Sequence, residues 1–236
     1  MVFGKATGFT AGLALADLDG SDGFRLDGID TYDYSGCSVS GAGDINGDGF
    51  ADLVVGAYYA GTNGESYVVF GKDAGFTADV DLSSLDGNDG FRLDGAAADD
   101  KRGQSVSGAG DVNGDGFADL IIGAYSADPN GDSQAGESYV VFGKASGFTT
   151  DLDLSALDGA DGFRLEGIDA SDRSGYSVSD AGDVNGDGFD DLIVGAFRAT
   201  SNGNSQAGES YVVFGKASEF TAGLDLSALD GTDGLR

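Results

Sequence analysis

Short apolar segments, each bounded by glycine or polar residues, set the hydrophobic pattern of the chain. In the first complete copy, residues 36–40 alternate in polarity and residues 52–57 are almost continuously apolar. Residues 65–70 are rich in Tyr, Val and Phe, and residues 90–94 alternate apolar with charged side chains. Segments of this length and period are typical of β-strands. The pattern therefore predicts four short strands in each copy.

The copies follow one another with a regular period. The segment Val-Phe-Gly-Lys starts at residues 2, 69, 141 and 213, so the repeat is about 70 residues long. Four strands at this period are typical of β-propeller blades, whose apolar middle strands are covered on both faces by neighbouring blades. We therefore predict an all-β fold of four-stranded antiparallel blades, forming one repeat region over residues 1–236. The blades are expected at about 33–95, 100–167 and 172–236, with residues 1–29 supplying the last two strands of a partial N-terminal blade.

A nine-residue acidic loop joins the first two strands of each blade, at 44–52, 111–119 and 183–191. Each loop has oxygen-bearing side chains at positions 1, 3, 5 and 9 and Gly at position 6. A hard cation is wrapped by oxygens at this spacing, together with the backbone carbonyl of position 7. We therefore predict three Ca²⁺ sites. Their candidate ligands are Asp44, Asn46, Asp48, Phe50 and Asp52; Asp111, Asn113, Asp115, Phe117 and Asp119; and Asp183, Asn185, Asp187, Phe189 and Asp191.

Two other interpretations of these loops are weaker. An EF-hand requires Glu at position 12, where this chain has Val55, Ile122 and Val194, and it requires flanking helices rather than strands. A plain Asn-Gly or Asp-Gly hairpin turn explains two residues of each loop, but it has no use for a third carboxylate at position 9.

A second set of acidic residues precedes the fourth strand of each copy. These Asp-Gly segments could hold a further ion, although turn chemistry alone suffices to explain them. The residues concerned are Asp19, Asp22, Asp86, Asp89, Asp158, Asp161, Asp230 and Asp233.

Composition narrows the classes of function. The formal net charge of −29 argues against binding to nucleic acid or to anionic membranes, which need clustered Lys and Arg. No apolar run is long enough to span a membrane, and Met1–Lys5 lacks the apolar segment of a signal peptide. Cys37 is the only cysteine, so no intrachain disulfide can form.

The repeated string Gly-x-Ser-Val-Ser-x-Ala-Gly-Asp-x-Asn-Gly-Asp-Gly-Phe-x-Asp-Leu, followed by Tyr-Val-Val-Phe-Gly, resembles the FG-GAP repeats of the integrin α-chain β-propeller and of bacterial surface proteins. The resemblance covers nearly the whole chain and implies a closed ring of seven blades. Two positions depart from the family pattern at blade edges. Ser35, Arg102 and Ser174 replace its Phe, and Tyr58, Tyr125 and Phe197 replace its Pro. Neither position is a predicted calcium ligand.

The number of blades bears on assembly. Three blades cannot close a ring of the usual four to eight, so we expect further blades from a longer chain or assembly with other copies. Such an assembly would be a dimer of half-rings or an open head-to-tail filament.

The function predicted from these features is a calcium-stabilised binding or adhesion module, secreted or at the cell surface, without catalytic activity. Loops of this kind in extracellular modules bind calcium at about 10⁻⁴–10⁻³ M, which cytosolic calcium would not fill. The chain has no His, and its acidic residues recur in every copy, unlike a catalytic site.

The expected partner is a protein or a carbohydrate, contacted through the long loops 128–136 and 200–208. Tyr58, Tyr59, Tyr125 and Phe197 could stack on sugar rings, as in a lectin, or fill gaps between blades. A structural spacer or self-assembling ring or filament subunit is the alternative.

Overall fold

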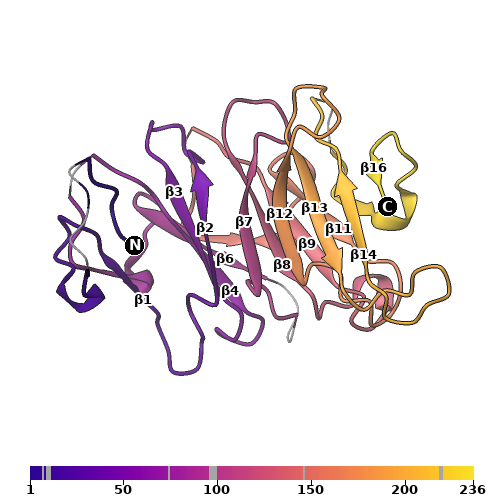
Figure 1. Ribbon diagram of the computed structural model, residues 1–236, viewed down its shortest axis with the longest axis horizontal. Helices are drawn as coiled ribbons and strands as arrows, with labels where there is room; N and C mark the ends of the chain where they lie inside the picture. The colour runs from indigo at the N-terminus through magenta and orange to yellow at the C-terminus, as the bar shows by residue number, and fades with distance from the viewer. Residues whose placement is uncertain (7, 9–11, 74, 96–99, 146, 218–219) are drawn as a thin grey trace.

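Three sheets, each built on four antiparallel strands, follow one another along the chain, as Figure 1 shows from the indigo N-terminal end to the yellow C-terminal end. The computed structural model describes residues 1–236 except 7, 9–11, 74, 96–99, 146 and 218–219. The all-β fold of blades is therefore confirmed. The blades consist of β2 (Ser38–Gly43), β3 (Asp52–Ala57), β4 (Glu65–Val69) and β6 (Gly90–Asp94); β7 (Ser105–Gly110), β8 (Asp119–Ala124), β9 (Glu137–Val141) and β11 (Gly162–Glu166); and β12 (Ser177–Gly182), β13 (Asp191–Ala196), β14 (Glu209–Val213) and β16 (Gly234–Leu235).

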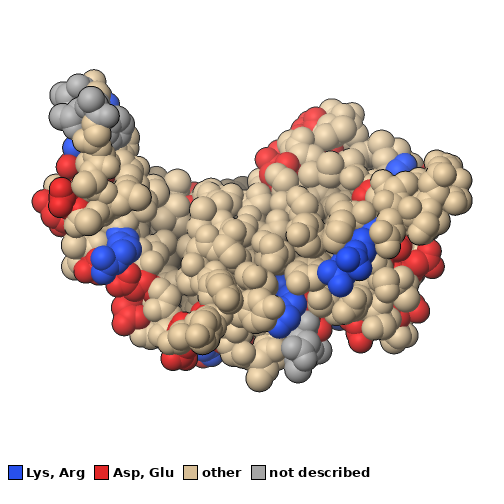
Figure 2. Space-filling model, turned by 60° about the horizontal axis from the view of Figure 1, so that its bottom comes forward, with Lys and Arg blue, Asp and Glu red and all other residues tan. Residues whose placement is uncertain are grey.

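Each sheet has the order expected of a propeller blade. In the first blade β2 pairs with β3, β3 with β4 and β4 with β6, all antiparallel. The first strands of neighbouring blades lie side by side, because the Ser38 hydroxyl accepts a hydrogen bond from the Val106 amide at 3.0 Å. Ser105 makes the same contact with Val178. The blades follow a curve, and Figure 2 shows the molecule as a crescent with a hollowed upper edge.

The hydrophobic core lies between the blades. One buried cluster joins Val54 and Phe91 of the first blade to Ile122 of the second, and another joins Ile121 of the second to Val194 of the third. The apolar middle strands of the first two blades are thus covered on both faces, as the sequence pattern predicted, whereas Ile193 on the middle strand of the third blade is 37% exposed. Each blade therefore depends on its neighbour for burial of its apolar surface.

A fifth strand, which the sequence analysis did not predict, links successive blades. Three residues between the third and fourth strands of each copy cross to the preceding blade and pair in parallel with its fourth strand. These pairs are β5 (Asp79–Asp81) with β1 (Arg25–Asp27), β10 (Asp151–Asp153) with β6, and β15 (Gly223–Asp225) with β11. A 3₁₀ turn follows each crossing strand, at Leu82–Ser84, Leu154–Ala156 and Leu226–Ala228; Leu15–Asp17 and Pro129–Gly131 are also 3₁₀.

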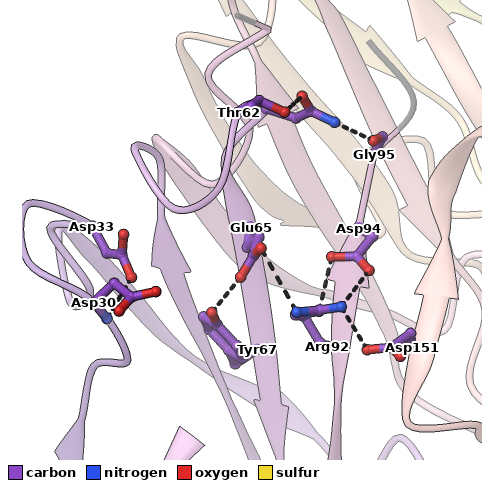
Figure 3. Close-up of polar contacts among 10 residues, drawn as sticks. Asp30, Asp33, Thr62, Glu65, Tyr67, Arg92, Asp94, Gly95 and Asp151 are labelled. Carbon is purple, nitrogen blue, oxygen red and sulfur yellow. Dashed lines mark hydrogen bonds and ion pairs between the residues drawn. The ribbon is translucent and has the colours of Figure 1, made fainter. Parts of the chain in front are cut away.

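Stacked rings and ion pairs hold the crossing strand in register. Phe91 of β6 stacks on Phe148, which precedes β10, with ring centroids 4.5 Å apart. Arg92 of β6 contacts Glu65 of β4 at 3.8 Å, Asp94 at 2.9 Å and Asp151 of β10 at 3.0 Å (Figure 3). Because Arg92 is partly exposed, this network fixes register more than it adds stability.

The N-terminal residues form the predicted remnant of a further blade. Val2 makes an isolated antiparallel bridge to Gly23, and β1 follows. At the position of a third strand the remnant has only the Val2 bridge. At the position of the fourth strand it has β1, which pairs with the crossing strand β5.

Candidate metal centre

The first acidic loop begins directly after β2 and ends in β3, and its side chains hold its own backbone. The Asp44 carboxylate accepts hydrogen bonds from the Asp48 amide at 3.0 Å and the Gly49 amide at 2.9 Å. Asn46 Oδ1 accepts from the Asp48 amide, and Asp48 Oδ1 accepts from the Phe50 amide, both at 2.9 Å. Side-chain oxygens that accept from local amides favour a tight turn. These bonds tie the side chains of positions 1, 3 and 5 to the backbone of one tight turn.

The other two loops repeat this geometry. In the second loop, Asp111 accepts from the Asp115 amide at 3.0 Å and the Gly116 amide at 2.9 Å. In the third, Asp183 accepts from the amides of Asp187 and Gly188, both at 3.0 Å. The glycines at position 6 have positive φ, as the sharp bend requires: Gly49 91°, Gly116 91° and Gly188 95°.

The aspartate at position 9 is buried and joins two parts of the blade. Both oxygens of Asp119 accept from backbone amides, from Val112 in the loop at 2.8 Å and from Gly143 after β9 at 2.9 Å. The equivalents Asp52 and Asp191 make the same pair of contacts at 2.7–3.0 Å. All three side chains are fully buried. The sequence placed these residues among the ligands but did not indicate this second, structural role.

Burial makes the charge at position 9 costly. Desolvation, reinforced by the nearby carboxylates of the same loop, raises the pKa of Asp52 to about 6 and that of Asp119 to about 7. The two amide hydrogen bonds act in the opposite direction and favour the charged form. The amide hydrogen bonds therefore offset part of the cost of burying a charge at position 9.

The contact between the position 9 aspartate and the Phe-Gly-Lys segment explains why that segment has glycine. A Cβ on Gly143 would lie 2.3 Å from the Ala118 carbonyl oxygen, and one on Gly215 would lie 2.4 Å from the Asp190 carbonyl oxygen. Only glycine allows the backbone to approach the loop this closely. The two repeated motifs of the sequence thus meet at one place in each blade.

Neighbouring acidic loops touch each other. Phe117 at position 7 of the second loop packs against Gly47 of the first, and Phe189 of the third packs against Gly114 of the second. The Ala118 amide also donates to the Asp44 carbonyl at 3.2 Å. The three loops therefore form a continuous row along one end of the blades.

The donor set suits a calcium ion. Each loop offers carboxylate and amide oxygens at positions 1, 3, 5 and 9 and a carbonyl at position 7, and calcium takes six to eight oxygen ligands. A carboxylate has about four lone-pair sites, so oxygens that accept one amide hydrogen bond can still bind a cation. Within the described residues, no three acidic, Cys or His side chains converge as a ready cluster. The fit therefore depends on the loop's donor chemistry and on its hydrogen-bonded shape.

The second set of acidic residues has the contacts of ordinary turns. Asp86 accepts from the Asn88 amide, Asp158 from the Ala160 amide and Asp230 from the Thr232 amide, each at 2.9 Å. Lys216 forms an ion pair with Asp233 at 3.2 Å. Local hydrogen bonds thus account for Asp86, Asp158 and Asp230, in agreement with the turn interpretation.

Aromatic residues gather at the opposite end of the blades. The strand β3 runs from the acidic loop to Ala57, so Tyr58 and Tyr59 lie about 20 Å from that loop. Their rings are 4.5 Å apart, and that of Tyr34 is 5.4 Å from Tyr59. Lys101 lies over the Tyr59 ring at 4.1 Å. These three tyrosines form the first aromatic cluster.

A second aromatic cluster lies one blade further on. Tyr176 contacts Tyr125 at 5.3 Å and Phe197 at 4.4 Å between ring centroids. Arg173 and Arg198 lie over Tyr125 and Phe197 at 5.4 and 5.5 Å. The second cluster therefore bridges two blades, whereas the three tyrosines of the first cluster belong to one blade. Tyr59 and Phe197 stay 47% and 44% exposed. Tyr34 and Tyr176 were not predicted, because they precede the first strand, at positions that differ between copies.

The remaining predicted features have local roles. In the long loop 128–136, Asp128 accepts from the Gln134 amide at 2.7 Å, and in loop 200–208 Ser201 bridges Asn204. The Cys37 thiol lies 3.3 Å from the Gly103 carbonyl. Arg102 is buried at one of the two departures from the family pattern, where it pairs with Asp100 at 2.5 Å.

Comparison with known proteins follows the same repeats. Residues 38–69, 102–141 and 174–213 match the FG-GAP repeat, and each match spans one acidic loop with the first three strands of a blade. The chain is 29% identical to integrin alpha-4 of Xenopus laevis over 75% of its length and 16% of that protein. It is 33% identical to phosphatidylinositol-glycan-specific phospholipase D of Dictyostelium discoideum (86% of this chain, 22% of that protein). It is 31% identical to integrin alpha-V of Gallus gallus (70% and 15%).

The chain thus spans 22% or less of the length of these relatives. No helix among the described residues has the length and apolar character needed to cross a membrane.

Proposed function

This chain is an FG-GAP repeat protein of the integrin α-like kind, and on that premise we propose that it is a calcium-stabilised binding module of a secreted or cell-surface protein. The observation that carries the proposal is the set of three acidic loops, which share one hydrogen-bonded geometry and one donor set. Calcium is the cation that such oxygen-only loops suit. Each ion would tie the end of a first strand to the start of a second and offset the repulsion between the loop's carboxylates.

Fifteen residues would hold the three ions. They are the side chains at positions 1, 3, 5 and 9 and the carbonyls of Phe50, Phe117 and Phe189. The position 9 aspartates would share their oxygens between the ion and two backbone amides. Loops of this class bind calcium at about 10⁻⁴–10⁻³ M in extracellular modules, which supports a site outside the cytosol.

Binding rather than catalysis is the role that the surface supports. The chain has no His and one Cys, and the acidic loops are nearly identical in all three blades. This chain matches 22% or less of the length of the relatives named phospholipase D. We propose that these repeats serve such proteins as a scaffold and contact surface, and that chemistry resides elsewhere.

The contact surface that we propose is formed by the two aromatic clusters. Exposed Tyr and Phe with adjacent cations suit a protein segment or a sugar ring, because aromatic faces supply apolar contact and cations supply charge. The chain has a net charge of −29, which would repel an acidic partner. The Lys and Arg side chains beside the aromatic clusters would reduce that electrostatic repulsion. The more specific form of this proposal is that the chain is a lectin, which binds carbohydrate on this surface.

Calcium binding is tested by unfolding the chain in calcium and in chelator. Three sites with dissociation constants of about 10⁻⁴–10⁻³ M add about 3–7 kcal/mol at about 5 mM calcium, because calcium binds only the folded loops. The melting temperature, followed by circular dichroism, is expected to rise by about 6–25 °C. Equal melting temperatures in calcium and in chelator would mean that the loops are acidic turns without bound calcium.

The contact surface is tested by replacing single aromatics. Tyr59→Ala and Phe197→Ala are expected to weaken any ligand found on a glycan array or a panel of extracellular proteins by about tenfold or more. Tyr32→Ala is the matched control, because Tyr32 is 76% exposed and has no ring contact among the described residues. Unchanged binding in both cluster variants would exclude this surface. A particle mass that grows with protein concentration would instead support the filament alternative.

A further inference from the structure

Position 8 distinguishes the third acidic loop from the other two. It is Ala51 in the first loop, Ala118 in the second and Asp190 in the third. The Asp190 side chain points back to the second loop, where its Oδ2 accepts a hydrogen bond from the Asp111 amide at 2.8 Å. The Asp190 amide also donates to the Asp111 carbonyl at 3.2 Å. A carboxylate of the third blade thus contacts the first residue of the second blade's loop.

The same place between the first and second loops has no such charge. The Ala118 amide donates to the Asp44 carbonyl at 3.2 Å, so the backbones of the two pairs of loops meet in the same way. A Cβ on Gly43 would lie 2.4 Å from the Ala118 methyl, and one on Gly110 would lie 2.1 Å from the Asp190 carboxylate. At position 8 the two interfaces therefore differ in charge, because the side chain is neutral in one and ionisable in the other.

We propose that Asp190 sets the calcium affinity of the second loop, so that this loop binds calcium more tightly than the first. This inference rests on the proposed calcium binding. An additional negative charge beside the loop attracts a divalent cation, and ligand charge is one of the factors that tune such loops. Among the residues that the structure describes, no Lys or Arg forms an ion pair with Asp190 that would cancel its charge.

Its position makes Asp190 a positioning residue rather than a direct ligand. Its hydrogen bond fixes the backbone of Asp111, whose side chain is already held by the Asp115 and Gly116 amides. Calcium in the second loop would in turn stabilise the contact between the second and third blades. Calcium binding in the second loop is therefore coupled to the interface between the second and third blades.

The test isolates the second loop within the full chain. Asp48→Asn and Asp187→Asn weaken the first and third sites, and calcium chloride is titrated by calorimetry at low salt. Adding Asp190→Ala, which restores the residue found in the other two loops, is expected to weaken the remaining site by about three- to tenfold. Asp190→Asn keeps an oxygen for the Asp111 amide but removes the charge, so it is expected to weaken the site by a similar factor.

Two further measurements separate charge from packing. The difference between parent and Asp190→Asn is expected to shrink in high salt, because the half-buried Asp190 carboxylate is still partly screened by salt. In a chain with Asp115→Asn and Asp187→Asn, where the first loop remains intact, Ala118→Asp is expected to tighten that loop by about three- to tenfold.

The outcomes separate this inference from the proposed function. An unchanged affinity in Asp190→Asn, or no gain from Ala118→Asp, would overturn the role of Asp190 while leaving calcium binding intact. A parent chain that binds no calcium would instead overturn the proposed function, together with this inference.

Discussion

The triple variant Asp48→Asn, Asp115→Asn and Asp187→Asn is expected to lose most of the stabilisation that we propose calcium gives the parent chain. Each change removes one unit of charge from a loop but keeps an Oδ1 that can accept the amide hydrogen bond of position 7. The turn should therefore persist while calcium affinity falls. With three sites lost, about 3–7 kcal/mol of calcium-dependent stability should disappear, lowering the melting temperature in about 5 mM calcium by about 6–25 °C.

Melting temperatures in calcium and in excess chelator measure this loss. The matched control is Asp86→Asn, Asp158→Asn and Asp230→Asn, which makes the same change in Asp-Gly turns whose aspartates also accept a local amide. The control is expected to keep the full calcium shift. If the control lost the calcium-dependent shift in melting temperature as fully as the loop variant, the effect would come from overall charge. If the loop variant kept the shift, the result would argue against calcium ions in the loops.

The blades could be predicted because their signals are local. Strands such as 52–57 and 65–70 are bounded by glycine and recur at a fixed period, and both properties are visible in the sequence. The crossing strands could not be predicted in the same way. Asp79–Asp81 is three residues long and pairs with Arg25–Asp27 of the preceding blade, more than 50 residues away. Pairing that crosses from one repeat to the next leaves no local pattern.

The acidic loops show the same limit within the candidate site. Spacing singled out the oxygens of Asp44, Asn46 and Asp48 as candidate ligands, because a turn that wraps a cation has a fixed register. It could not show that Asp52 also holds the Gly71 amide, since that glycine follows the third strand of the blade, 19 residues further along the chain. Two independent motifs, the acidic loop and the Phe-Gly-Lys segment, prove to be halves of one contact. The consequence is that position 9 carries a structural role that spacing alone assigns to the ion.

Replacing Asp119 by Ala is expected to destabilise the chain even in chelator. Its two oxygens are the partners of the Val112 and Gly143 amides, and the side chain is fully buried. Each orphaned buried amide costs about 1–3 kcal/mol. We therefore expect a loss of about 2–6 kcal/mol in the free energy of unfolding, measured by urea denaturation in excess chelator.

Graded variants show whether the two amides are the cause. Asp119→Asn keeps one acceptor oxygen but turns an NH₂ group toward the other amide, so it should also destabilise, by less than Ala if the oxygen finds its partner. It also remains measurable if Asp119→Ala fails to fold. Asp158→Ala is the control in the same blade, because Asp158 is exposed and accepts one amide at 2.9 Å; it should cost about 1 kcal/mol or less. Equal losses at positions 119 and 158 would contradict the structural role. A large loss in chelator at position 119 alone would show that this aspartate stabilises the blade without an ion, by joining its acidic loop to its third strand.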